Sequence, residues 1–219
     1  MNGSAAIHDV EVARNGRTSE IVEEGLKDGT FGMARETAEF LNTAADRAAG
    51  AETGLGETLG TMLLEEGAPH ASVSLLASAA AAGVPATVHV ALGTDIVHQH
   101  PGAHGEAIGA SSLRDFRILA ARVAALEGGT VLNVGSAVLM PEVFLKALTV
   151  ARNLGHGVDG FTAANFDMLR HYRPVTNVVR RPTAGRGWGV DLAGHHEILI
   201  PLLTAVLADR LDVAQGGGG

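Results

Sequence analysis

The chain contains no cysteine, which excludes disulfides, thiol catalysis and metal sites built on thiolates. Aromatic residues make up only 4% of its 219 residues, with one tryptophan and one tyrosine. Basic residues are also few, because 16 Lys and Arg stand against 24 Asp and Glu, for a net charge of -8. A general nucleic-acid binder needs clustered Lys and Arg to neutralise phosphates, so the charge balance disfavours that class.

Long apolar runs are absent too, since the Ala-rich stretch Leu75–Val84 is too short to span a membrane. No secretory signal is visible at the N-terminus. Hydrophobic residues nevertheless make up 46% of the chain, which is enough for a packed core. The composition therefore predicts a cytoplasmic protein with a single domain over residues 1–211. A disordered, glycine-rich tail is expected over residues 212–219.

From Pro69 onward, segments with helical spacing alternate with short apolar runs rich in β-branched residues. This alternation predicts an α/β fold: a Rossmann-like parallel sheet with helices on both faces, in three layers. Strands are expected at Ala86–Leu92, Thr130–Val134, Val158–Thr162, Val175–Val179 and, more briefly, His196–Ile200. Helices are expected at Arg17–Leu26, Met33–Ala49, Glu57–Glu66, His70–Ala82, Ser111–Leu126, Pro141–Leu154 and Glu197–Leu211.

The beginning of the chain is unusual for such a fold. Residues Gly3–Asp9 form a Gly/Ser/Ala segment leading into Ile7 and Asp9, as expected of a strand-to-helix turn, yet no apolar strand precedes them. Such a turn normally follows the strand that aims it at its ligand. This pattern predicts that the N-terminal part of the fold is missing, and the alternative is a frayed terminus with no role.

Ligands of open parallel sheets bind beyond the carboxyl ends of the strands, and four predicted loops qualify. The first loop follows Leu92 and is rich in groups that can bind a ligand. It contains Thr94, Asp95, His98, His100, His104 and Glu106. Its histidines are candidate metal ligands, although the spacing matches no strong zinc signature. Alternatively, Asp95 accepts hydrogen bonds from a cofactor hydroxyl while a histidine holds the substrate, or the histidines are structural.

Two further loops are short. Gly135 and Ser136 precede a helix, and backbone N–H groups at such a turn favour anionic or carbonyl oxygens. The segment Thr162–Asp167 follows a predicted strand, and its small residues would let a ligand approach the backbone. Asp167 would then bind a ribose hydroxyl or a cation, unless it serves as a helix cap.

The fourth loop, from Arg180 to Glu197, is rich in glycine and expected to be mobile. Its arginines could bind phosphate or carboxylate, its histidines could transfer protons near neutral pH, and its tryptophan could stack on a ligand or contact another subunit. The residues concerned are Arg181, Arg186, Trp188, His195, His196 and Glu197.

Three motifs in this part of the chain resemble those of deoxyhypusine synthases. Thr162–Asp167 reads T-A-A-N-F-D, Arg181-Pro182 follows, and Trp188-Gly189-Val190 comes last. The family carries T-A-x-x-F-D, an R-P and then W-G-K. Weaker similarity extends from Gly3 to about Leu203. The resemblance implies a deoxyhypusine synthase-like fold, an NAD cofactor and a homotetramer.

Two elements of that family's active site are replaced here. The lysine of W-G-K forms an imine with the aminobutyl donor, whereas Val190 cannot. Of the glycines in the family's G-G-G-V-x-K-H-H segment only Gly135 is present, and Met140-Pro141-Glu142 stand where its lysine and histidines would be. The resemblance therefore implies an NAD-type cleft without deoxyhypusine synthesis. The cofactor contacts would be Gly3, Ser4, Asp9, Thr94, Asp95, Gly135, Ser136, Thr162, Ala163 and Asp167.

The leading hypothesis is a divergent, NAD-binding member of this family that acts on a small, anionic molecule. It expects Asp9, Asp95, Thr162–Asp167 and Trp188 to cluster at one sheet edge. Acid–base catalysis is assigned to His98, His100, His195, His196 and Glu197, and substrate contacts to His104, Glu106, Arg181, Arg186 and Trp188. One alternative is a metal-dependent enzyme that uses His98, His100, His104 and Glu106, with His195 and His196 as further ligands that could complete the site. Another is an inactive regulatory or scaffold homologue.

Overall fold

The computed structural model describes residues 1–18 and 22–216. The chain forms two compact units, Met1–Ala121 (unit 1) and Arg122–Gly219 (unit 2), and the division falls inside helix α6 (Gly105–Ala124). The single domain predicted from composition over residues 1–211 stays a prediction. No helix in the described ranges is long and apolar enough to cross a membrane.

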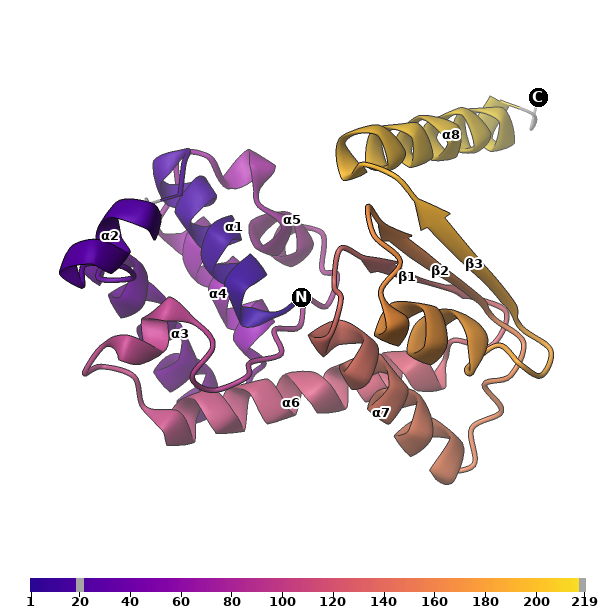
Figure 1. Cartoon of the computed structure of the whole chain (residues 1–219), viewed down its shortest axis with the longest axis horizontal. Coiled ribbons are helices and arrows are strands. Elements are labelled where there is room, and N and C mark those ends of the chain that lie inside the picture. Colours follow the sequence, from indigo (N-terminus) through magenta and orange to yellow (C-terminus); the bar gives the residue numbers. More distant parts are fainter. Residues whose placement is uncertain (19–21, 217–219) are drawn as a thin grey trace. The chain divides into compact units, whose positions relative to one another are not determined.

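Unit 1 is built from helices that surround one apolar core (Figure 1). Along the chain they are α1 (Gly3–Asn15), α2 (Val22–Asp28), α3 (Arg35–Ala51), α4 (Leu55–Glu65), the 3-10 turn η1 (Ala71–Val73), α5 (Leu75–Ala81), the 3-10 turn η2 (Ile96–Gln99) and most of α6. The apolar faces of α1, α3 and α4 meet in this core, where Val10, Ala44 and Leu59 have no exposed surface.

Helix α1 replaces the strand-to-helix turn that the sequence predicted. Asn2 caps it, because its side-chain oxygen accepts a hydrogen bond from the Ala5 amide at 2.9 Å. Gly16 ends it in the left-handed conformation at φ 71°, where glycine is favoured. Small residues are typical of a loop, but the Asn2 cap and the buried face of Ala6, Ile7 and Val10 favour a helix here.

The strand predicted at Ala86–Leu92 is also wrong. In the described residues this segment makes only one isolated bridge, between Asn2 and His89. Its β-branched residues are held by other contacts: Val90 N donates to Ser112 Oγ at 3.0 Å, and Val88 N donates to a carboxylate of α6. A strand requires a partner strand along its length, and residue composition alone cannot supply one.

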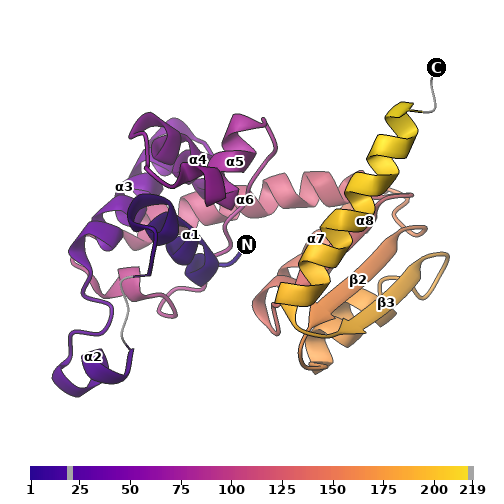
Figure 2. The same ribbon diagram turned by 90° about the horizontal axis from the view of Figure 1, so that it is seen from above.

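Unit 2 contains a parallel sheet of three strands, which confirms the α/β class. The strands are β1 (Thr130–Val134), β2 (Thr162–Asp167) and β3 (Trp188–Ala193), side by side in that order (Figure 1; β2 and β3 also in Figure 2). The registers pair Asn133 with Asn165 and Asn165 with Asp191. Strand β2 is central, and its last five residues are buried.

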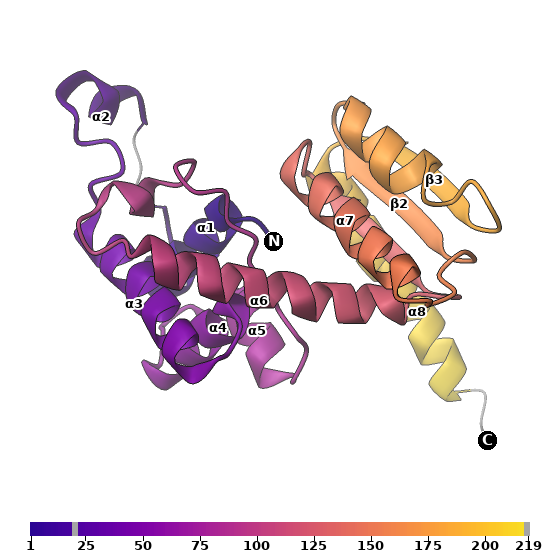
Figure 3. The same cartoon turned by 90° about the horizontal axis from the view of Figure 1, so that it is seen from below.

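The connecting elements of unit 2 are helical. Helix α7 (Leu139–Asn153) and the π-helical segment η3 (Pro174–Arg180) pack together, and η3 also packs on β2 and β3 (Figure 3). Phe144 of α7 meets Phe161 edge to face at 6.2 Å between ring centroids. Helix α8 (His196–Gly216) contacts β2.

Several predicted elements of unit 2 are corrected. The strand predicted at Val158–Thr162 is displaced to Thr162–Asp167, the predicted loop. Val175–Val179 belongs to η3 and His196–Ile200 to α8, so neither is a strand. The expected mobile loop from Arg180 contains β3. Helix α8 continues to Gly216 where a disordered tail was expected from residue 212, and residues 217–219 lie outside the described residues.

Candidate functional site

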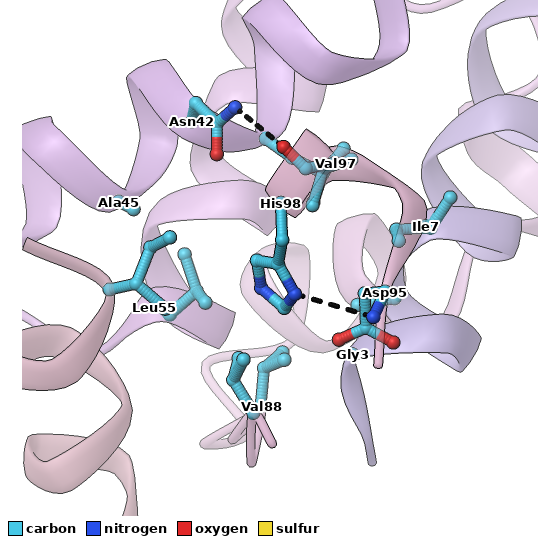
Figure 4. Close-up of a pocket in the computed structure, with 13 residues that line it drawn as sticks. Gly3, Ile7, Asn42, Ala45, Leu55, Val88, Asp95, Val97 and His98 are labelled. Atoms are coloured by element: carbon cyan, nitrogen blue, oxygen red, sulfur yellow. Dashed lines mark hydrogen bonds between the residues drawn. The ribbon is translucent and has the colours of Figure 1, made fainter. Parts of the chain in front are cut away.

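The structure brings Gly3, Ser4, Asp95 and His98, four of the predicted site residues of unit 1, together at the start of α1; Figure 4 shows Gly3, Asp95 and His98. Ser4 Oγ donates to Asp95 Oδ1 at 2.7 Å, and Gly3 lies so close to the same carboxylate that any Cβ there would collide with it. His98 Nδ1 accepts hydrogen bonds from the amides of Asp95 at 3.3 Å and Gly93 at 3.1 Å. Thr94 is exposed, and its hydroxyl donates to Ala91 O.

The cavity beside Asp95 is too small for a nucleotide. Its volume is about 20 Å³, and a single water needs roughly 10–15 Å³ by this measure. Apolar side chains, Leu55 and Val88 among them, form much of its wall (Figure 4). A dinucleotide would therefore have to bind outside this cavity.

The hydrogen bonds of His98 also restrict its chemistry. Because Nδ1 accepts from two backbone amides, the proton of the neutral ring must be on Nε2. The side chain thus caps η2 together with Asp95, in a reciprocal capping box. This arrangement makes His98 a structural residue in this conformation, where the sequence predicted a catalytic one.

Asp9, predicted to bind a cofactor, instead caps another helix. Its carboxylate accepts hydrogen bonds from Ser74 Oγ at 2.6 Å and from the amides of Leu75 at 2.7 Å and Leu76 at 3.2 Å. These groups form the start of α5, where backbone N–H groups lack partners within the helix. The Asp9 carboxylate is therefore engaged in joining α1 to α5.

Sequence reasoning also missed Asp115 and His89, two buried titratable residues of unit 1 whose pKa values are shifted. Asp115 has no exposed surface, and its Oδ2 accepts from the amides of Gly56 at 2.9 Å and Val88 at 2.7 Å. Oδ1 has no hydrogen-bond partner in the described residues. Burial raises the pKa of Asp115 to about 6 and lowers the pKa of His89 to about 4. An α6 carboxylate thereby supports the start of α4.

A second, larger cavity of unit 1 lies between α3 and residues 100–104. Its volume is about 590 Å³, within the range of small-molecule sites. Two predicted histidines line it: His100 Nε2 donates to Gly32 O at 2.8 Å, and His104 Nδ1 donates to Asp46 at 2.9 and 3.0 Å. Glu106 is exposed in the first turn of α6.

The metal-dependent alternative has no site in this arrangement. His98, His100 and His104 each face a different partner: backbone amides, the Gly32 carbonyl and Asp46. Across residues 1–18 and 22–216, no group of three His, Asp or Glu side chains could hold a metal ion. His195 and His196, proposed to complete such a site, belong to unit 2.

In unit 2, predicted site residues meet at the carboxyl edge of the sheet, which comprises the ends of β1, β2 and β3 and the residues that follow them. His196 Nε2 donates to Phe166 O at 3.0 Å, and its ring lies against Gly135. Gly135 adopts φ 65°, and its amide donates to the same carbonyl at 2.9 Å. Ser136 Oγ accepts from the Met140 amide at 3.1 Å, at the start of α7.

His196 has the geometry of a proton acceptor. A carbonyl can only accept a hydrogen bond, so Nε2 carries the proton of the neutral ring and Nδ1 carries a lone pair. No hydrogen bond to Nδ1 occurs among the residues that the structure describes. Asp167 is buried nearby at the end of β2, where Oδ1 accepts from the Leu169 amide at 3.2 Å. His195 and Glu197 are exposed.

A polar ladder, formed by Asn133, Asn165 and Asp191, crosses the sheet close to this edge. Asn133 Nδ2 donates to Asn165 Oδ1 at 2.8 Å, and Asn165 Nδ2 donates to Asp191 Oδ1 at 2.8 Å. Asn133 Nδ2 also donates to Ser136 O at 3.0 Å. At the other end, Arg170 Nε forms an ion pair with Asp191 Oδ2 at 3.0 Å.

Sequence analysis did not identify the polar ladder, because the strands β2 and β3 were not predicted at their actual positions. Asn133, Asn165 and Asp191 each occupy the fourth position of a strand. Had β2 and β3 been recognised, this equal spacing would have placed the three side chains in one row, because parallel strands in register align equivalent positions.

Other predicted residues lie at the opposite, amino edge of the sheet. Thr162 and Trp188 are the first residues of β2 and β3 and pair in register. Five residues along a strand separate Thr162 from Asp167, which is about 16 Å at ~3.3 Å per residue. The predicted clustering of Thr162–Asp167 with Trp188 at one edge is therefore wrong. Asp9 and Asp95 belong to unit 1.

The remaining candidates of unit 2 also have local partners. Ala163 is a fully buried residue of β2. Arg186 Nη2 pairs with Glu127 Oε1 at 3.0 Å, and Arg181 Nη1 donates to Asn177 Oδ1 at 2.9 Å. Val190, at the position of the family's lysine, is half-buried within β3.

Comparisons with known proteins supply no family for this chain. No family model matches it, and no match is found among curated proteins or solved structures. The similarity to deoxyhypusine synthases therefore rests on the motifs quoted above.

Proposed function

We propose that the chain is a deoxyhypusine synthase-like protein that binds an NAD-type nucleotide at the carboxyl edge of the unit 2 sheet. The observation that supports it most directly is the His196 ring, held against Gly135 by the Phe166 carbonyl at the ends of β1 and β2. Ligands of parallel sheets bind at this edge. In the full proposal α8 is the third layer, completing a Rossmann-like arrangement.

Each group at this edge has a part in the proposal. The turn at Gly135 and Ser136 leads into α7, whose N-terminal end attracts anionic groups. Asp167, buried at the end of the central strand, accepts a hydrogen bond from a ribose hydroxyl. His196 Nδ1 accepts a proton or a hydrogen bond from the bound molecule.

Deoxyhypusine synthesis is not part of the proposal. The family's imine requires a primary amine, and the side chain at position 190 is a valine within β3. Proton transfer by His196 requires no such covalent intermediate. The reaction class that we propose is therefore acid–base chemistry on a small molecule beside a nucleotide.

Calorimetric titration of the full chain with NAD tests this proposal. We expect saturable binding to the wild type, and at least a several-fold weaker affinity for His196→Ala because the variant loses one polar contact. His195→Ala is the matched control, since the neighbouring His195 is exposed. Absence of binding by NAD and by related nucleotides would overturn the proposal.

Self-association belongs to the same proposal, because the family forms homotetramers. Several large apolar side chains of α8 support it: Ile198 is 65% exposed, Leu202 58% and Leu211 61%. Exposed apolar surface of this kind marks protein contact sites. Light scattering on the full chain should give the mass of an oligomer, and a monomer at micromolar concentration would contradict this part.

A further inference from the structure

The polar ladder is a costly arrangement for the middle of a sheet. Asn165 is 1% exposed and Asn133 6%, so both amides have lost their contact with water. Burying such groups is tolerated only when they are hydrogen-bonded, and here each bond points toward β3. One oxygen of Asp191 therefore accepts a hydrogen bond from the Asn165 amide, which the Asn133 amide holds in turn, and this fixes the orientation of the carboxylate.

The fixed carboxylate in turn holds Arg170. Asp191 is 18% exposed and faces Nε of Arg170 with its second oxygen, at 3.0 Å. The Arg170 side chain is 69% exposed, and within the described residues its Nη1 and Nη2 atoms form no hydrogen bond. A guanidinium anchored through Nε keeps donors at its terminal nitrogens that suit the oxygens of a phosphate or carboxylate.

Three of the other arginines of unit 2 use their terminal nitrogens internally. Arg152 Nη2 donates to Val158 O at 2.6 Å and to Pro182 O at 3.1 Å, Arg181 Nη1 donates to Asn177, and Arg186 Nη2 binds Glu127. Arg173 and the exposed Arg180 do not: Arg173 pairs through Nε with Glu142 at 3.4 Å, and the Arg180 side chain forms no hydrogen bond or ion pair within the described residues. The Glu142 carboxylate is also bound by Lys146 and Asn177, whereas Asp191 is held by the buried ladder.

We propose that Arg170 binds a phosphate oxyanion at the carboxyl edge, and that Asn133, Asn165 and Asp191 are positioning residues for it. The ladder also bonds Ser136 O in the turn before α7, so it connects both sides of this edge. The inference rests on the proposed function for the location of the ligand, and it assigns the diphosphate of that ligand to Arg170.

The test is calorimetry on the full chain with two probes, NAD and inorganic pyrophosphate. Arg170→Gln should weaken binding of both by roughly tenfold or more, because a charge-assisted pair of hydrogen bonds is lost. Arg186→Gln is the matched control: it forms an ion pair at the same 3.0 Å, with its side chain 72% exposed, at the amino edge. Its affinities should stay within about twofold of the wild type.

Positioning is tested by the double variant. Asp191→Asn keeps an oxygen for the Asn165 amide but loses the charge that holds Arg170, so it should weaken pyrophosphate binding as well. Combining Asp191→Asn with Arg170→Gln should cause no further loss, while the melting temperature reports whether the fold is intact. Additive losses would show that Asp191 acts independently of Arg170 and would overturn its positioning role.

The two probes separate this inference from the proposed function. If pyrophosphate binds in a way that depends on Arg170 but NAD does not bind, the proposed nucleotide function is overturned and the oxyanion site is supported. NAD binding that is unchanged in Arg170→Gln would keep the function and overturn the inference. If Arg173→Gln weakens pyrophosphate binding and Arg170→Gln does not, the oxyanion binds at Arg173, and the inference is overturned too. Absence of binding by both probes would overturn both.

Discussion

The two units use their polar side chains in different ways. In unit 1 three aspartates serve the beginnings of helices: Asp9 at α5, Asp95 at α1 and Asp115 at α4. In unit 2 the buried polar groups bond one another across strands, and the chain of bonds ends at an exposed arginine. The three aspartates of unit 1 thus accept hydrogen bonds from the fold itself, whereas unit 2 leaves the terminal nitrogens of Arg170 exposed at its surface. A ligand-binding role therefore has more support in unit 2.

Loss of the Asp115 carboxylate should have the largest effect of any change considered. Asp115→Ala leaves the buried amides of Gly56 and Val88 without an acceptor, at a cost of roughly 1–3 kcal/mol each. We expect the free energy of unfolding to fall by about 4 kcal/mol in urea titrations. Asp115→Asn keeps an acceptor and should cost less. An Ala variant as stable as the wild type would contradict a structural use of this acid.

Asp115 and His89 should have opposite effects on the pH dependence of the free energy of unfolding. Asp115 has its pKa raised from 3.8 to about 6, so its contribution to stability grows as pH falls from 6 to 4. His89 has its pKa lowered from 6.5 to about 4, so its contribution is lost as pH falls over nearly the same range. A difference of about two pKa units is roughly 3 kcal/mol, and the two contributions nearly cancel.

His89→Gln removes one side of this balance. Relative to the wild type, the variant should therefore gain up to about 3 kcal/mol of stability between pH 6.5 and 4. Urea titrations at several pH values measure the difference, and His156→Gln, at an exposed position in unit 2, is the control. A constant difference across this range would mean that His89 titrates normally.

The polar ladder should matter less for stability than the acid of α6. Asn165→Ala removes two hydrogen bonds and leaves Asn133 Nδ2 and Asp191 with one partner fewer, a cost of about 2 kcal/mol. Asn153→Ala at the exposed end of α7 should be nearly neutral. If Asn165→Ala proves more damaging than Asp115→Ala, the contrast between the units is reversed and the ladder is primarily structural.

The smallest effects are expected at the histidines near residue 100. The His104–Asp46 pair has side chains 62% and 44% exposed, so Asp46→Asn should change the free energy of unfolding by no more than ~0.5 kcal/mol. No group of three His, Asp or Glu side chains in the described residues could hold a metal ion, so a chelator should leave the melting temperature unchanged within about 1 °C. A bound structural metal would contribute directly to folding, and its removal would lower the melting temperature. A larger drop with chelator would restore the metal-dependent alternative.

Local patterns were sufficient for elements that are determined locally. The predictions at Thr130–Val134, Met33–Ala49 and Pro141–Leu154 are confirmed within a few residues, since a β-branched run between glycines or a clear apolar periodicity determines each. Val175–Val179 has the same β-branched character, yet it packs as the π-helix η3 against the sheet. Tertiary contacts override propensity there, and no local signal records them.

The candidate site was predicted only in part, for a related reason. Gly135, Ser136, Asp167 and His196 were selected because they follow apolar runs or carry titratable groups, and the structure places them at one edge. Trp188 and Thr162 were placed at the wrong end because a displaced strand exchanges its two edges. Asn133 and Asn165 were overlooked because their hydrogen bond joins two strands that are far apart in the sequence, and the sequence alone does not show that pairing.

The amides of the polar ladder have only one permitted orientation. Asn165 must present Nδ2 to the ionised Asp191, which leaves Oδ1 facing β1, so Asn133 must present Nδ2 in turn. Rotating either amide by a half turn would bring two oxygens or two nitrogens face to face. The charge of Asp191 on β3 therefore determines which way the Asn133 amide points on β1, two strands away. The side-chain hydrogen bonds all run in one direction across the sheet, from β1 to β3, a direction that the backbone alone does not set.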